Sequence, residues 1–87
     1  MLYRRSNQVK VKKVGNNTAL YVSEQKGIHV LNETALFIWE VLQEPFTFDE
    51  LLYMLSEVFE GGTTKMKEDL NEILDLFLEY DLVDTAT

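Results

Sequence analysis

The spacing of apolar residues changes once along the chain, at Asn32. Before that residue, short runs of strand-forming side chains are separated by turn signals around residues 15–17 and 24–27, and the pattern predicts strands over about 9–14, 19–23 and 27–31. After it, apolar residues recur with a period near 3.6, which predicts helices over about 33–43, 48–60 and 64–80. Short connections favour a three-stranded antiparallel sheet followed by three helices, an α+β fold in the order β-β-β-α-α-α.

Residues at the ends of the predicted helices support these boundaries. Asn32 can accept a hydrogen bond from the first turn of the first helix. Thr47 and Glu50 have the spacing of a capping box, in which each side chain bonds the other residue's backbone N–H at the start of the second helix. Asp81 follows the third helix and is expected to adopt a left-handed backbone conformation that ends it.

The length of the chain limits what it can do. Its 87 residues suffice for one domain, which has little interior for both a hydrophobic core and a deep substrate pocket. Cysteine is absent, which excludes disulfides, thiolate metal sites and a cysteine nucleophile. The longest apolar run, Ala35–Trp39, is far shorter than a membrane span. We therefore expect a single domain over 1–87 that is not an enzyme and is cytoplasmic, with no membrane partner.

Charge is divided unevenly along the chain, whose net charge is −7. Residues 1–30 contain six basic side chains and one acidic one, whereas residues 31–87 contain two basic and fourteen acidic side chains. Three strands and three helices also suit a winged helix-turn-helix protein, whose third helix would enter the major groove of DNA. The predicted third helix carries five acids against Lys65 and Lys67, so it would repel phosphate, and we expect no nucleic-acid partner.

The apolar face of the predicted third helix is unusually wide. At 100° per residue it covers an arc of roughly 200°, about twice what a helix resting on one core requires. Its members are Leu76, Tyr80, Ile73, Met66, Phe77, Leu70, Leu74 and Leu78. Either the helix lies between two layers of its own fold, or one edge is left for a partner. The opposite face is a stripe of acids, which a solvated helix surface explains. These acids are Glu68, Glu72, Asp75 and Glu79.

Catalytic and metal-ligating side chains are sparse. His29 is the only histidine, and we expect it at an exposed position of the third strand, with Ile28 and Val30 on the other face. No serine has the glycine context of a nucleophile elbow, and Gly61-Gly62 lacks the lysine that follows in a phosphate-binding loop. The sequence therefore predicts no catalytic residue, no metal site and no cofactor.

A free sheet edge beside an apolar helix edge is the remaining feature with a chemical use. An extended peptide can pair with the unpaired N–H and C=O groups of an edge strand, while side chains of an adjacent helix select its sequence. The third strand and third helix can form such a cleft, in which Gly27 allows close approach of a backbone. Ile73, Leu76 and Tyr80 would supply its apolar surface. The pattern favours peptide recognition.

The order and spacing of several short motifs resemble a known family. These motifs are Leu31-Asn32, Thr34-Ala35, Ile38-Trp39, Thr47 with Glu50-Leu51, Asp69-Leu70, Ile73-Leu74, Phe77 and Leu82-Val83. From about Val9 to Val83 the chain is similar to the PqqD family, which supplies the RiPP recognition element, a small domain that binds the leader of ribosomally made, post-translationally modified peptides. The chain departs from the family at Asp81, where glycine is frequent.

This resemblance implies a winged-helix-like fold and a non-catalytic peptide chaperone. A precursor's leader would be added as a strand beside the third strand and against the third helix, and would be presented to a modifying enzyme such as a radical S-adenosylmethionine protein or a lasso-peptide protease or cyclase. Asp69 would pair with a basic leader residue. The implied peptide-binding residues are Gly27, Ile28, His29, Val30 and Leu31 on the strand and Lys65, Asp69, Ile73 and Leu76 on the helix.

Two alternatives belong to other functional classes. A winged-helix DNA-binding regulator would show retention on DNA that depends steeply on salt. A structural subunit would use its spare apolar helix edge to form a homodimer, which is also compatible with peptide binding.

Overall fold

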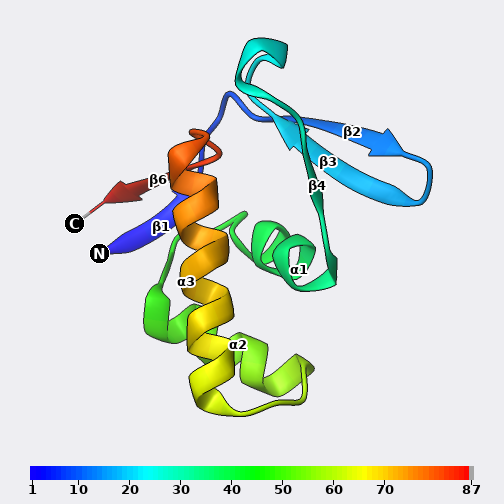
Figure 1. Ribbon diagram of the computed structural model, residues 1–87. Helices are drawn as coiled ribbons and strands as arrows, with labels where there is room; N and C mark the ends of the chain where they lie inside the picture. Colours follow the sequence, from blue (N-terminus) through cyan, green and yellow to red (C-terminus); the bar gives the residue numbers. More distant parts are fainter. Residues whose placement is uncertain (87) are drawn as a thin grey trace.

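The computed structural model describes residues 1–86, which form three helices, six short strands and one turn of 3-10 helix (Figure 1). The elements are β1 (Leu2–Arg5), β2 (Lys10–Val14), β3 (Asn17–Tyr21), the 3-10 turn Glu24–Lys26, β4 (His29–Leu31), α1 (Glu33–Val41), β5 (Phe46–Thr47), α2 (Phe48–Val58), α3 (Thr63–Glu79) and β6 (Val83–Ala86). The class is α+β, as predicted, with a three-stranded antiparallel sheet followed by three helices. Among these residues, no helix combines the length and apolarity needed to cross a membrane.

The strands form two sheets of three rather than one. The predicted sheet has the order β2-β3-β4, whereas a second sheet with the order β5-β1-β6 is absent from the sequence-based expectation. In this second sheet Leu2 pairs with Thr47 on one side and with Ala86 on the other. Strands of two to four residues are too short to show an alternating pattern, and their partners lie far away in sequence. The expectation of a single sheet is therefore incomplete.

The first sheet begins and ends at slightly different residues from those predicted. β3 covers Asn17–Tyr21 instead of 19–23, and β4 is limited to His29–Leu31 instead of 27–31. The start of β4 is delayed because the preceding residues form a 3-10 turn and Gly27 has a φ of 100°, which is incompatible with an extended strand. All three helices lie within two residues of their predicted limits.

The local signals at the helix ends are confirmed. The Asn32 side chain accepts a hydrogen bond of 2.8 Å from the backbone N–H of Ala35. Thr47 and Glu50 form the complete capping box, with distances of 3.1 and 2.9 Å. Asp81 has a φ of 59°, the left-handed conformation expected after α3. These contacts fix where α1 and α2 begin and where α3 turns into the second sheet.

The hydrophobic core lies among the three helices and the inner faces of both sheets. The middle of α3 supplies Met66, Leu70, Leu74 and Phe77, all of which are buried. Phe77 packs edge-on against Trp39 of α1, with ring centroids 6.2 Å apart. In Figure 1, α3 stands between β4 on one side and the β1–β6 pair on the other. The helix therefore has neighbours on two sides, and its fit against β4 determines the site described below.

Arg5 ties the N-terminal strand to α1. Its Nε donates a hydrogen bond of 2.8 Å to the carbonyl oxygen of Trp39, and its guanidinium lies 4.3 Å from the centroid of the Trp39 ring. Burial lowers the pKa of Arg5 from its ordinary value, while attraction to Glu40 acts in the opposite direction. The group stays charged because an arginine pKa is so high. It therefore combines a charge-assisted hydrogen bond with a cation–π contact.

We expect Arg5→Ala to lower the free energy of unfolding by about 2 kcal/mol, because it removes both contacts and leaves the Trp39 carbonyl without its partner. Urea denaturation measures this loss. Arg4→Ala is the matched control: Arg4 is exposed, and its removal should cost less than about 0.5 kcal/mol. Equal losses for the two variants would contradict the assigned role of Arg5.

Candidate functional site

Strand β4 has one unpaired edge. On its inner side it pairs with β3, placing Val30 opposite Ala19 and Leu31 opposite Thr18. Within residues 1–86 no strand pairs with its outer side, because β4 ends the order β2-β3-β4. The C-terminal strand β6 pairs with β1 and leaves β4 uncovered. The N–H and C=O groups along this edge are therefore available to a further strand.

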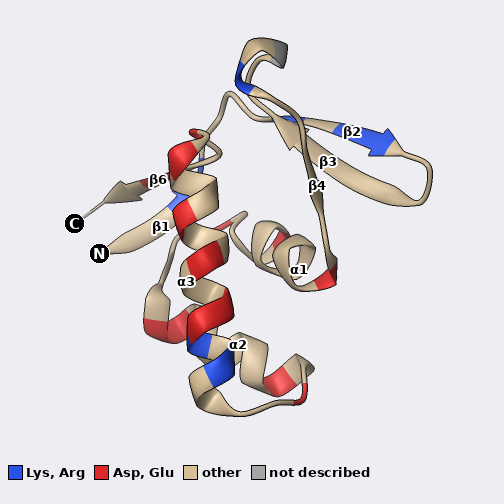
Figure 2. Ribbon diagram, viewed as in Figure 1, with Lys and Arg blue, Asp and Glu red and all other residues tan. Residues whose placement is uncertain are grey.

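The other edge of the same sheet has a different character. β2 carries Lys10, Lys12 and Lys13 within five residues, and all of its side chains are exposed. Lysines on an edge strand oppose pairing with another chain, because a new strand would bring its own groups against those charges. β4 contains no lysine. Figure 2 shows basic residues on β2 and none on β4. Of the two edges, β4 is therefore the one suited to receive a strand.

One edge of α3 faces β4 and is only partly covered. Ile73 and Tyr80 are half-buried, and Leu76 has 36% of its surface exposed. Spacings of three and four residues align them along a single helix edge. The wide apolar arc is therefore explained by both expected alternatives: its centre packs in the core, and this edge remains open. We call β4, its preceding residues 27–28 and this edge of α3, from Lys65 to Tyr80, the seam.

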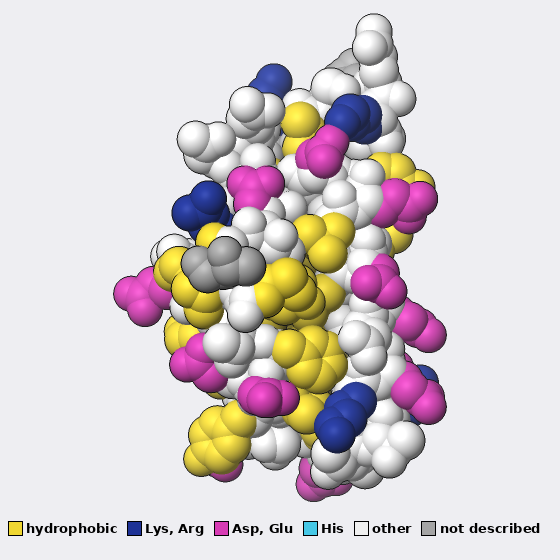
Figure 3. All heavy atoms as spheres, turned by 90° about the vertical axis from the view of Figure 1, so that its left-hand side faces the viewer, with side chains coloured by type: hydrophobic (Ala, Val, Ile, Leu, Met, Phe, Trp, Pro, Cys, Tyr) yellow, Lys and Arg dark blue, Asp and Glu magenta, His cyan; other side chains and the backbone are white. Residues whose placement is uncertain are grey.

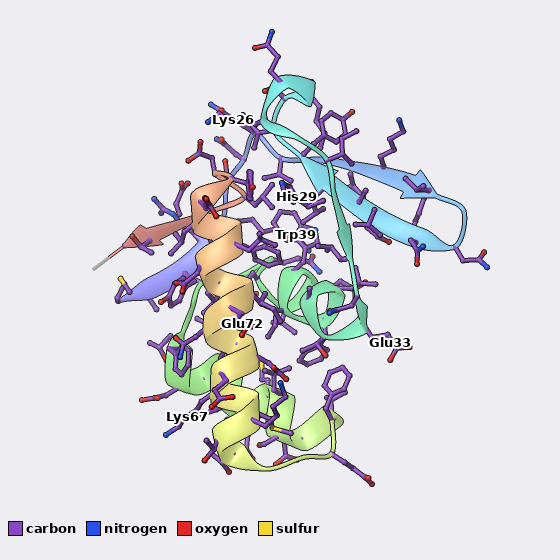
Figure 4. All side chains as sticks on the ribbon, in the orientation of Figure 1. Lys26, His29, Glu33, Trp39, Lys67 and Glu72 are labelled. Carbon is purple, nitrogen blue, oxygen red and sulfur yellow. The ribbon has the colours of Figure 1, made fainter. Side chains whose placement is uncertain are left out.

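The end of the seam near the C-terminus of α3 is closed by two contacts. His29 stacks against Tyr80, with ring centroids 3.9 Å apart, and Lys26 forms an ion pair with Asp81. Figure 4 shows Lys26 at the top of the fold and His29 between α3 and β4. The expectation that His29 is exposed is wrong, because the fold brings Tyr80 onto its ring. The Nε2 atom of His29 is buried and has no hydrogen-bond partner among the described residues.

The opposite end of the seam is more open. The Nζ of Lys65 donates to the carboxylate of Asp69 at 2.8 Å, and this hydrogen bond, followed by charge attraction, raises the pKa of Lys65. A cavity of about 130 Å³ lies beside this pair, between Thr34 of α1 and Phe59 at the end of α2. Apolar cavities of about 150 Å³ accept a benzene ring. The cavity is therefore large enough for one apolar side chain of a bound peptide.

The side chains of the seam strand point to two faces. Leu31 is buried in the core, and His29 lies on the same inner face against α3. Ile28 and Val30 are exposed, and 56% of the surface of Val30 is accessible. Leu31 can thus contribute only its backbone to a ligand, whereas His29 can contribute its ring as well. Gly27 precedes them, and apart from its chain neighbours a Cβ added there would meet only the Nε2 of His29, at 3.7 Å.

The structure places the predicted strand residues 27–31 beside the C-terminal end of α3, where His29 contacts Tyr80. Lys65 and Asp69 lie near the other end of α3, beside the cavity next to Thr34 and Phe59. Ile73 and Leu76 lie between these two ends of the helix. Sequence reasoning did not identify the pairing of Lys26 with Asp81, which are 55 residues apart, or the cavity beside Thr34. No local sequence signal reports such contacts. In residues 1–86, no cluster of three His, Cys, Asp or Glu residues is arranged to bind a metal.

Solved structures share this fold along almost the whole chain. TbiB1 in complex with the TbiA(beta) leader peptide superposes with a TM-score of 0.77 at 15% sequence identity, covering 97% of this chain and 98% of that chain. Lasso peptide synthetase B1 complexed with the leader peptide gives a TM-score of 0.76 at 17% identity, with 95% and 98% covered. At these identities the likeness concerns the fold.

Comparison at the level of sequence identifies the family. No curated protein sequence matches the chain. The model of the family described as coenzyme PQQ synthesis protein D (PqqD) matches residues 17–83, which include β3, β4, all three helices and the whole seam. The chain therefore belongs to the PqqD family.

Proposed function

We propose that this protein binds the leader segment of a ribosomally made precursor peptide by adding it as a strand to β4. The observation that carries this proposal is the unpaired edge of β4 lying beside the exposed apolar edge of α3. Backbone hydrogen bonds to the strand would supply affinity, and Ile73, Leu76 and the cavity near Asp69 would select side chains. Support comes from two proteins of the same fold that were solved with leader peptides bound.

The two ends of the seam support one placement of the peptide. The contacts of His29 with Tyr80 and of Lys26 with Asp81 obstruct one end, so the added strand would extend from them toward the cavity. Asp69 already pairs with Lys65. A basic leader residue would have to displace Lys65 to reach that carboxylate, which makes apolar contacts the main source of selectivity.

The protein's role would be to present the peptide and not to alter it. A modifying enzyme, such as a radical S-adenosylmethionine protein or a lasso-peptide protease or cyclase, would act on the core of the bound precursor. Holding the leader close to that enzyme raises the effective concentration of the substrate. We place this exchange in the cytoplasm, where precursors are synthesised.

We expect leader segments of short precursors encoded beside the gene to bind with a dissociation constant near or below the micromolar range. This corresponds to a binding free energy of about −8 kcal/mol or somewhat more favourable. Titration followed by backbone amide shifts should perturb residues 27–31 and 65–80. Perturbations confined to other elements would contradict the proposal that the leader binds at the seam. Retention on DNA that depends steeply on salt, without peptide binding, would favour the alternative of a winged-helix DNA-binding regulator. Sedimentation that changes with protein concentration, without peptide binding, would favour the alternative of a homodimeric structural subunit.

A further inference from the structure

A second apolar surface lies away from the seam, where α1 ends and α2 begins. Two hollows of about 410 and 420 Å³ adjoin there. Phe46 and Met54 line both hollows, and Tyr53 lines the first. The two hollows are neighbours that share Phe46 and Met54, and we call them together the α2 groove. None of its lining residues belongs to the seam.

Within residues 1–86, the two hollows of the α2 groove are lined by acids and by no basic residue, while a third hollow, which shares Asp49 and Tyr53 with the first, places Lys67 of α3 near one end of the groove. Glu40 and Glu44 border one hollow, Asp49 and Glu50 border the other, and no Lys, Arg or His residue lines either of them in the described chain. The ion pairs among residues 1–86 join Lys26 to Asp81 and Lys65 to Asp69, so none involves these four carboxylates. Glu40 also attracts Arg5, and Glu50 accepts the hydrogen bond of the Thr47 N–H, so Glu44 and Asp49 are the acids whose charge is most available to a basic ligand.

The apolar residues of the groove are exposed more than a folded core requires. Tyr53 has 65% of its surface accessible, the largest value among the exposed large hydrophobic side chains of the described residues. Met54 and Phe46 are half-buried beside it. Figure 3 shows a face on which hydrophobic side chains gather in a band, with acidic side chains and some basic ones at its borders. Flexible methionine and an exposed aromatic ring are typical of surfaces that receive a partner's apolar side chains.

We propose that the α2 groove docks a basic amphipathic helix of a partner protein. The apolar face of that helix would enter the groove over Phe46, Tyr53 and Met54, and its lysines or arginines would lie beside Glu40, Glu44 and Asp49. Charge complementarity determines this choice of occupant, since a neutral helix would leave Glu44 and Asp49 without a basic partner and an acidic one would be repelled by them. Because the groove and the seam share no residue, leader and partner can be held at the same time.

The acidic stripe of α3 provides a contrast within the same molecule. Glu68, Glu72, Asp75 and Glu79 are all exposed, and Figure 2 shows acids along much of this helix. None of these residues lines either hollow of the α2 groove. Charge alone would therefore attract a basic helix to both surfaces, whereas apolar contact is offered by the groove. Variants on the two surfaces can separate these contributions.

The test uses two synthetic peptides of about 18 residues, a length at which helices become stable enough to study. One carries Leu and Phe on one helical face and Lys elsewhere, and the other has Glu in place of every Lys. We expect the basic peptide to bind and to shift the amides of residues 40–54. Tyr53→Ser and Glu44→Lys should each weaken this binding about tenfold, and leader binding at the seam should be unchanged.

Matched controls are Val58→Ser, which removes an exposed apolar side chain of α2 outside the groove, and Glu72→Lys, which reverses a charge on the stripe. Neither should weaken binding of the basic peptide more than about twofold. Absence of binding at about 1 mM, equal binding of the acidic peptide, or equal loss with Glu44→Lys and Glu72→Lys would overturn the proposal. Leader titrations on the same variants test the seam separately.

Discussion

Leu76→Asp is expected to weaken leader binding about 100-fold, or about 2.7 kcal/mol. Leu76 lies on the open edge of α3 with 36% of its surface exposed, where an added strand would cover it. The substitution removes apolar contact with the peptide and introduces a carboxylate at the same position. When the peptide covers that position, the carboxylate loses its hydrating water. Desolvation of a charge without a partner costs more than the lost contact, so most of the effect comes from the carboxylate. Calorimetric titration with the leader measures it.

Leu78→Asp is the matched control for this prediction. Leu78 lies two residues further along α3, about 200° around the helix from Leu76, and it is also partly buried. Both changes should reduce the free energy of unfolding, but only Leu76→Asp alters the seam. Thermal denaturation shows which variants are folded at the temperature of the titration. A similar loss of leader affinity in both folded variants would show that the effect of Leu76→Asp does not arise from contact with the peptide at the seam.

The features that the sequence predicts correctly depend on contacts within a few residues. Asn32 at the start of α1 and the pair Thr47 and Glu50 at the start of α2 act within one helical turn, so their patterns are visible locally. The open edge of α3 can be inferred from the sequence for a related reason. Its apolar arc is wider than one core can cover, and Leu76 lies at the edge that remains exposed.

Contacts between distant segments could not be predicted in this way. β1 pairs Tyr3 with Phe46 and Thr85, and neither partner is indicated by the short run of residues around it. His29 is half-buried because Tyr80 comes from the other end of the chain. An alternating strand pattern reports which face a residue occupies, but not which element covers that face. The sequence therefore indicates a strand and a helix edge that can form a seam, but it does not indicate the contacts that close one end of it.

Phe77→Ala is expected to remove a large part of the protein's stability. Phe77 is fully buried in α3 and packs against Trp39, so the change leaves a cavity where the helix meets α1. Such substitutions cost about 3–5 kcal/mol, whereas a domain of 87 residues has a total free energy of unfolding of about 4–13 kcal/mol. Urea denaturation should show a large fall in the transition midpoint with little change in its slope.

The position of Phe77 makes this loss relevant to the seam. Phe77 follows Leu76 directly and packs against Trp39 of α1, so we expect its loss to let α3 shift relative to α1 and to disturb the neighbouring edge. A folded fraction of Phe77→Ala, recovered at low temperature, should therefore also bind the leader more weakly. Tyr53→Ala removes an aromatic ring that is 65% exposed and should cost less than about 0.5 kcal/mol. A loss below about 1 kcal/mol for Phe77→Ala would mean that α3 is not anchored by this contact.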